Sequence, residues 1–196
     1  IDSNWWLHTE DADERQHSVA ALASALEAAA PDLTIVAAHH PYRTSGAHSG
    51  LLGPTVDPYW ILRRSGSVRQ SVTSAPYESM LVEMAGVFAK AGPPFLFVAG
   101  HDHSLQLFEG RAATDPDWSI VSGAASKLSP VADQADLVWG SRTAGYARLV
   151  FARDGRVLVF MDAAPEDFGG CVEVETSSCL PGGAPAPRTV FSKRLR

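Results

Sequence analysis

The pattern of apolar and polar positions predicts alternating helices and strands over the first hundred residues of the chain. Apolar residues recur at helical spacing over residues 13–30 and again over residues 76–90. Continuous apolar runs over residues 33–38 and 95–99 are typical of buried strands. This order of helix, strand, helix and strand favours a β-α-β unit with parallel strands.

The second half of the chain has a different pattern, with short strand-like runs and few helical signals. These runs cover residues 105–108, 118–121, 146–151 and 157–161. Asp154-Gly155 separates the last two and is a common hairpin turn sequence. We therefore expect an α/β fold with a β-rich second half, in which neighbouring strands are mostly antiparallel.

Three segments show neither a helical nor a strand-like period. Residues 1–7 are typical of the end of a strand and the turn that follows it. Residues 40–73 are rich in Gly, Pro, Ser and Arg, and at this length a loop is usually functional or disordered. Residues 180–196 combine a Pro- and Gly-rich stretch with a basic tail, for which we expect loose structure.

Composition and charge narrow the possible classes of protein. With 196 residues, 45% of them hydrophobic, the chain is long enough for one domain with a sizeable core. The formal net charge of −6 disfavours nucleic-acid binding, because phosphates would be repelled. An anionic substrate would need local positive charge, most simply from metal ions. We find no apolar stretch that approaches the roughly 20 residues of a membrane span.

The chain has two cysteines, Cys171 and Cys179, separated by seven residues. Their spacing allows a disulfide, two free thiols or, less readily, a zinc pair. A disulfide would contribute roughly 2–3 kcal/mol in the chain-entropy model. It would also indicate an oxidising compartment, and hence a secreted or periplasmic protein. The sequence leaves these alternatives, and the localisation, open.

Two histidine clusters follow the two predicted buried strands. His39 and His40 come directly after residues 33–38, whereas His101 and His103 follow residues 95–99. Loops at strand ends are where α/β sheets gather ligands, and neutral imidazole is a common ligand of transition metals. We therefore predict a metal site built across neighbouring strand ends. The alternative is that these are ordinary polar loop residues.

Other polar residues near these clusters have candidate roles. His48 lies among small residues in the long loop, so its ring is free to reach a pocket, although a solvated loop histidine has the same pattern. Asp102, between two candidate ligands, is expected to bond backbone groups of the turn or a ligand imidazole. We assign no role to His8 or His17.

The motifs Ala37-Ala38-His39-His40-Pro41, Ala47-His48-Ser49-Gly50 and Gly100-His101-Asp102-His103-Ser104-Leu105-Gln106 together resemble those of a known enzyme family. They are similar to the calcineurin-like metallophosphoesterases, especially the purple (tartrate-resistant) acid phosphatase branch. The likeness covers about residues 1–150. It implies that the chain is the C-terminal half of a four-layer α/β/β/α sandwich, with residues 1–165 forming a partial metallophosphoesterase domain and residues 166–196 a C-terminal extension that is partly loose.

The resemblance also implies a mechanism and a set of roles. Two metal ions (Fe, Zn or Mn) would activate a hydroxide that attacks a phosphate ester in line. His39, His101 and His103 would be metal ligands. His48 would contact the substrate phosphate or protonate the leaving group, and would thus be both a substrate-binding and a catalytic residue. Asp102 and His40 would hold the ligands in place.

The chain departs from the family at its acidic metal motifs. Asp-x-His, Gly-Asp-x-x-Asp and Gly-Asn-His-Asp/Glu do not occur in it. The simplest account is that they lie upstream of Ile1, so the chain's first partner would be the missing N-terminal half of the domain. Because three neutral imidazoles bring no bridging carboxylate, we predict weak or single-metal binding and little activity for this chain alone.

Two alternatives to this hydrolase remain open at the level of sequence. The first is a non-catalytic binding module with a vestigial metal site, in which residues 40–73 and the β-rich half bind a partner. The second is another class of metal hydrolase, such as the metallo-β-lactamases, whose His-x-His-x-Asp-His cluster is absent here. The sequence identifies neither the substrate nor the metal.

Overall fold

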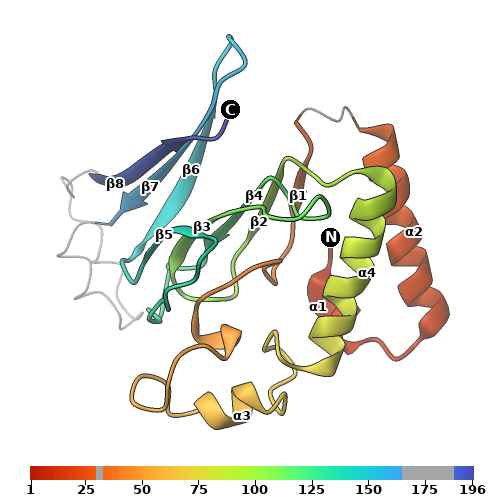
Figure 1. Ribbon diagram of the computed structural model, residues 1–196, viewed down its shortest axis with the longest axis horizontal. Coiled ribbons are helices and arrows are strands. Elements are labelled where there is room, and N and C mark those ends of the chain that lie inside the picture. Colours follow the sequence, from red (N-terminus) through yellow and green to blue (C-terminus); the bar gives the residue numbers. More distant parts are fainter. Residues whose placement is uncertain (30–32, 165–187) are drawn as a thin grey trace, which may run out of the picture.

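The fold has three layers in a computed structural model that describes residues 1–29, 33–164 and 188–196. Helices cover one face of a five-stranded sheet, and a three-stranded sheet packs on its other face (Figure 1). These are three of the four layers that the resemblance implies. Cys171 and Cys179 lie outside the described residues.

The five-stranded sheet contains both parallel and antiparallel strands. Its order is β1 (Ile35–Ala37), β2 (Leu96–Ala99), β4 (Trp118–Ser122), β3 (Leu105–Glu109) and β5 (Leu137–Ser141). Strands β1, β2 and β4 are parallel, whereas β3 is antiparallel to both β4 and β5. The carboxyl ends of β1, β2 and β4 therefore meet at one edge of the molecule.

The helical layer consists of α1 (Ser3–His8), α2 (Ala12–Ala28) and α4 (Ala75–Ala91). Helix α4 buries the apolar stripe that the sequence predicts, including Met80, Met84 and Phe88, against Phe97 of β2. It connects β1 to β2 as a crossover between parallel strands, so the predicted β-α-β unit is confirmed. None of the helices in the described part of the chain is long and apolar enough to cross a membrane.

The second sheet consists of β6 (Gly145–Phe151), β7 (Val157–Ala163) and β8 (Arg188–Arg194), which pair as antiparallel neighbours. The predicted hairpin between β6 and β7 is confirmed, and Gly155 in its turn has φ 84°. Residues Val157, Val159 and Met161 of β7 are buried against the first sheet. This packing forms the second core of the molecule.

Several local predictions are wrong. Residues 1–7 are not the end of a strand: α1 begins at Ser3, because the Asp2 carboxylate accepts a bond from Trp5 N–H (2.9 Å) and Trp6 and Leu7 are buried. Arg188–Arg194 is not loose but forms β8, where Phe191 stacks on Trp139. The boundary expected near residue 165 stays a prediction.

The long loop and the sheet edge contain elements that the sequence pattern did not predict. Residues 40–73 include a 3-10 turn at Ala47–Ser49 and the short helix α3 at Trp60–Arg64. Strand β5 was not expected, since its residues are only partly buried at the edge of the sheet. These short elements give too few residues for a clear period.

Candidate metal centre

The two histidine clusters meet because β1 and β2 are parallel neighbours. Strand β1 leads into His39 and His40, and β2 leads into Gly100 and His101. The N–H of Gly100 donates to the carbonyl of His39 (3.1 Å), which joins the two loops just beyond the sheet. The sheet register thus places imidazoles from two chain crossings at one edge.

His39, His40 and His101 form a compact cluster. One ligand nitrogen from each ring lies within 4.8 Å of the other two. The ring centroids of His40 and His101 are 4.4 Å apart, and those of His39 and His101 are 5.1 Å apart. His39 is exposed, whereas His40 is fully buried. The cluster therefore reaches from the protein interior to the surface.

The backbone and one hydrogen bond fix the orientation of His101. Its φ of 64° is left-handed, which is uncommon for a residue with a side chain. Its Nε2 lies 2.9 Å from the carbonyl oxygen of Gln70, which can only accept, so Nε2 carries the proton in this bond. In the neutral ring the lone pair is then on Nδ1, which lies 3.2 Å from Nε2 of His39.

His40 is held from behind by helix α1. Its Nδ1 lies 3.0 Å from the hydroxyl of Ser3, and the same hydroxyl accepts a bond from the His40 N–H (2.9 Å). Among the described residues, its Nε2 has no hydrogen-bond partner although it is buried. A buried polar atom without a partner is costly, so this nitrogen calls for an explanation.

Asp102 ties the turn after β2 to the loop after β1. Its side chain is fully buried and accepts bonds from the Thr44 hydroxyl and from the His48 N–H (3.0 Å). Gly46 passes so close that a Cβ there would lie 2.5 Å from the Asp102 Cγ. The Asp102 carboxyl group thus supports the loop that carries His48.

His48 packs against the cluster. Its ring centroid is 4.1 Å from that of His101, and its Nδ1 is buried without a hydrogen-bond partner in the described part of the chain. Burial lowers the pKa of His48, and this effect outweighs the nearby Asp102 carboxylate, which raises it. His48 therefore lies beside the cluster, positioned by Asp102 through its backbone.

Burial keeps the two inner rings of the cluster uncharged. It lowers the pKa of His40 to about 3, with a further contribution from the neighbouring imidazoles. It lowers the pKa of His101 to about 4, and the charge of His48 acts in the same direction. Both rings are therefore neutral at pH 7, which is the form that binds metals.

The structure brings together some of the residues predicted for the site and not others. His39 and His101 lie in one cluster, but its third member is His40 and not His103. His103 is partly buried, accepts a bond from Ser129 N–H through its carbonyl (2.8 Å) and interacts electrostatically with His48. The metal-ligand and catalytic roles of these residues stay predictions.

Four further residues support the site and were not predicted. Ser3 orients His40, Gln70 orients His101, and Thr44 holds Asp102. Gln106 accepts a bond from Ser45 N–H (2.7 Å) and donates to the Ser104 hydroxyl (2.8 Å). Gln106 belongs to the motif quoted above, whereas Thr44 and Gln70 lie in the long loop of residues 40–73, where no local pattern singles them out.

The spacing of one pair in the cluster, His39 and His101, fits a transition-metal cation. Two imidazoles that bind one tetrahedral zinc ion at about 2.0–2.1 Å would have their nitrogens about 3.3 Å apart. The observed 3.2 Å between His39 Nε2 and His101 Nδ1 is close to this value. Without a cation, the same distance is that of a hydrogen bond from one ring to the other. The unpartnered Nε2 of His40 favours the first interpretation.

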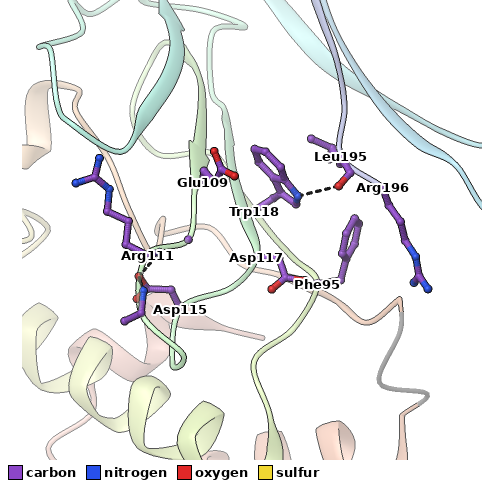
Figure 2. Close-up of a pocket in the computed structure, with 10 residues that line it drawn as sticks. Phe95, Glu109, Arg111, Asp115, Asp117, Trp118, Leu195 and Arg196 are labelled. Atoms are coloured by element: carbon purple, nitrogen blue, oxygen red, sulfur yellow. Dashed lines mark hydrogen bonds between the residues drawn. The ribbon is translucent and has the colours of Figure 1, made fainter.

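The largest cavity described for the structure lies at the opposite end of the sheet. It has a volume of about 610 Å³ and lies beside the amino ends of β2 and β4, at Phe95 and Trp118. Figure 2 shows the Trp118 indole donating to the carbonyl of Leu195 (3.2 Å), while the charged ends of Glu109 and Arg196 point in different directions.

Comparisons with known proteins identify the fold. No family model and no curated protein matches the sequence. One similar solved structure is GAP50, the anchor in the inner membrane complex of Plasmodium, with TM-score 0.54 and 14% identity over 98% of this chain and 48% of that chain. Another is purple acid phosphatase PPD1 from yellow lupin (Lupinus luteus) seeds, with TM-score 0.53 and 12% identity over 81% of this chain and 27% of that chain.

These likenesses define the class of fold. The chain has a mixed α/β fold similar to the C-terminal region of a purple acid phosphatase. It spans about half the length of GAP50 and about a quarter of the lupin enzyme. At these identities the likeness extends to the fold, and chemistry has to be argued from the site itself.

Proposed function

We propose that this chain is part of a metal-dependent phosphoric ester hydrolase, in which His39, His40 and His101 bind a cation. The observation that carries the proposal is that one nitrogen from each of three imidazoles lies within 4.8 Å of the other two, with the buried Nε2 of His40 left without a partner among the described residues. The phosphatase-like fold supports the choice of phosphate esters as substrates.

The residues of this chain would have distinct roles in binding the cation and the substrate. His40 and His101 are neutral because burial lowers the pKa of each ring, and Ser3 and Gln70 keep them oriented. A bound cation would act as a Lewis acid on a phosphoryl oxygen. His48, which packs on His101, would bind the phosphate or give a proton to the leaving oxygen.

The complete site would need carboxylates from elsewhere. Three imidazoles add no negative charge, and the Asp102 carboxyl group is already engaged with Thr44 and His48. We propose that the N-terminal half of the domain supplies the acidic residues that bridge two ions of Fe, Zn or Mn. Alone, this chain would bind one cation weakly and turn over phosphate esters slowly. His103 lies outside this cluster, and we do not include it among the proposed ligands.

A second candidate function is a non-catalytic binding module. It is favoured by the likeness to GAP50, which is described as an anchor. In this case the histidines would only be hydrogen-bonded to one another, as His39 and His101 can be. The two candidates differ in whether the cluster binds a metal at all.

Calorimetric titration with Zn²⁺ tests the proposal. We expect one ion per chain, with no proton released by His40 or His101 at pH 7, because both rings are already neutral. His101→Ala should weaken binding about tenfold or more, since ring nitrogens bind zinc directly. His103→Ala should change it much less, and His17→Ala, exposed on α2, is the matched control.

The outcomes separate the two candidates. An absence of binding in the unsubstituted chain would contradict the metal proposal and favour the binding module. An equal loss in His101→Ala and His103→Ala would show that His103 is a ligand. Rapid hydrolysis of p-nitrophenyl phosphate by the zinc-loaded chain would contradict the need for carboxylates from outside it.

A further inference from the structure

The buried polar side-chain atoms that lack a hydrogen-bond partner are concentrated in one loop. Among the described residues, all of them belong to positions 40–71, which follow β1 directly. The residues that contribute them are His40, Arg43, Ser45, His48, Asp57, Arg63 and Ser71. A buried polar atom without a partner costs free energy, and such atoms are rare in folded proteins. This loop therefore holds polar groups whose bonding capacity the fold itself does not use.

Arg63 brings a charge into this loop. It lies on α3, and its side chain is only 16% exposed, so the charge is buried but still open to solvent on one side. Its Nε and Nη1 are buried and have no hydrogen-bond partner in the described part of the chain. A guanidinium in a protein cannot lose its proton, and a buried charge is costly unless it is hydrogen-bonded. Arg63 therefore has more donor groups than acceptors to receive them.

The carboxylate paired with Arg63 is that of Asp57, and their contact is loose. Oδ2 of Asp57 lies 3.5 Å from Nε of Arg63, whereas a charge-assisted hydrogen bond measures about 2.7–2.9 Å. The same oxygen has no hydrogen-bond partner among the described residues. Arg43, in contrast, has carboxylate oxygens of two different residues at 2.7 and 3.0 Å. Arg63 is thus balanced in charge but not in hydrogen bonds.

The loop places Arg63 close to His48. Helix α3 packs against the 3-10 turn that carries His48, and it lies beyond the carboxyl end of the sheet (Figure 1). The Arg63 carbonyl accepts a bond from the Thr73 hydroxyl, and the His48 carbonyl accepts one from Val72 N–H (3.0 Å). Burial and the nearby charge of Arg63 both lower the pKa of His48. Arg63 is therefore a cation at the margin of the histidine cluster.

Helix α3 buries its charge and exposes its apolar side chains. Ile61 and Leu62 are 66% and 48% exposed, although residues of these types are usually buried and arginine is usually exposed. Arg64, the next residue, follows the usual rule: it is exposed, and its guanidinium lies over the Trp60 ring, 5.7 Å from its centre. Packing preferences alone would turn this helix the other way. Its orientation favours a role for the Arg63 charge inside the loop.

We propose that Arg63 binds the phosphate group of the substrate, beside His48. Phosphate oxygens suit a guanidinium, because its planar fork can donate two parallel hydrogen bonds to them. Arg63 would also supply local positive charge to an anion that approaches a chain with a net charge of −6. The proposal rests on the function proposed above, since the phosphate is that of the substrate. Arg63 is not among the proposed ligands of the cation, so the two proposals can be tested separately.

Titration with inorganic phosphate, followed by calorimetry, tests the role of Arg63. The full chain is titrated once with a chelator present and once after loading with Zn²⁺. Arg63→Gln should weaken phosphate binding about tenfold or more in both conditions, because bonds between charged groups are lost. Arg64→Gln is the matched control, since it removes the same charge from an exposed position of the same helix. It should weaken binding less than about twofold, because solvent and salt screen an exposed charge.

Asp57→Asn separates phosphate binding from a purely structural role of Arg63. The amide oxygen can still accept the bond that Asp57 Oδ1 now receives from Tyr59 N–H (3.0 Å), so the turn is kept. If Arg63 binds phosphate, removing the competing carboxylate should strengthen binding about two- to fivefold. If Arg63 only holds the loop through Asp57, then Asp57→Asn and Arg63→Gln should both weaken phosphate binding.

Four results would overturn the proposal. These are no phosphate binding by the unsubstituted chain, unchanged binding in Arg63→Gln, an equal loss in Arg63→Gln and Arg64→Gln, or a loss shared by Arg63→Gln and Asp57→Asn. Thermal unfolding checks that each variant is folded. If Arg63→Gln does not fold, Arg63→Lys and Arg64→Lys replace the first pair, because lysine keeps the charge but cannot donate two parallel bonds.

The Zn²⁺ titration distinguishes this proposal from that of the metal site. A chain that binds phosphate through Arg63 but binds no Zn²⁺ would contradict the metal-dependent hydrolase and leave Arg63 as a phosphate-binding residue. A chain that binds Zn²⁺, and whose phosphate binding is the same with and without Arg63, would contradict only the role of Arg63.

Discussion

The two ends of the five-stranded sheet differ in how their polar groups are arranged. At the carboxyl end, beyond β1 and β2, polar side chains are buried and converge on one another, and His40 and His48 each have a nitrogen without a partner in the described part of the chain. At the amino end, around the larger cavity, Glu109 and Asp117 are exposed to solvent, and Asp115 is bonded to Arg43 and to backbone N–H groups.

This difference shows that the largest described cavity and the cluster of convergent polar groups lie in different places. The larger space is lined by groups that solvent or neighbouring residues already satisfy. In the compact cluster, Nε2 of His40 lacks a partner among the described residues, and burial keeps the rings of His40 and His101 neutral. A site is better recognised by unsatisfied and convergent groups than by room alone.

The largest effect is expected from removing the central carboxyl group at the carboxyl end. Asp102→Ala would leave the Thr44 hydroxyl and the His48 N–H without their acceptor in a buried place. At about 1–3 kcal/mol for each of the two groups, we expect a loss of about 2–6 kcal/mol in the free energy of unfolding, measured with urea. Asp117→Asn, exposed at the amino end, should change it by less than about 0.5 kcal/mol. If Asp102→Ala and Asp117→Asn changed the free energy of unfolding equally, the proposed difference between the carboxyl and amino ends of the sheet would be wrong.

Acid should destabilise the metal-free chain through the same cluster. The pKa of His40 is lowered to about 3 and that of His101 to about 4, so between pH 6.5 and about 4 the unfolded chain binds protons that the folded chain does not. Stability should fall with decreasing pH in this window, by up to about 1.4 kcal/mol per pH unit for each group.

Urea unfolding in the presence of a chelator measures this slope. His40→Gln should reduce it, because the substitution removes the titrating ring, whereas His17→Gln, at an exposed position on α2, should not change it. A chain whose stability is constant between pH 7 and 5 would show that the rings are not buried as described.

A smaller effect is expected where the backbone passes close to Asp102. In Gly46→Ala, the new Cβ would lie 2.5 Å from the Asp102 Cγ, so the loop or the side chain must move. Such overpacking costs about 1–3 kcal/mol. Gly100→Ala is the control, since a Cβ there has nothing within 4 Å. Urea unfolding of the two variants measures this cost. A lower midpoint for Gly46→Ala than for Gly100→Ala would show that the loop with Gly46 packs tightly against the turn with Asp102.

Sequence periodicity predicted the elements that carry long apolar stripes. Helix α4 and strands β1 and β2 lie within a residue or two of their predicted ranges, because burial dictates their pattern. Helix α1 could not be predicted in this way, since six residues are fewer than two turns and its start depends on the Asp2 cap. Strand β8 was missed because it is largely exposed, and its alternation is weak.

The candidate site was predicted in part for a related reason. Strand-end position indicated His39 and His101, but spacing could not show which of His40 and His103 would join them. That depends on the left-handed backbone at His101 and on Ser3, which lies 37 positions from His40 in the sequence. Hydrogen bonds between residues that are far apart in the sequence depend on tertiary packing, which local sequence patterns do not predict.

The backbone of His101 has a consequence for how this protein can change over time. A side chain in the left-handed region costs of order 1–3 kcal/mol, and glycine adopts the same region freely. His101→Gly would relieve that cost while deleting the imidazole. Selection for a more stable chain would therefore favour glycine at this position, whereas selection for the cluster would retain histidine. A homologue that has lost the chemistry is expected to have glycine there first.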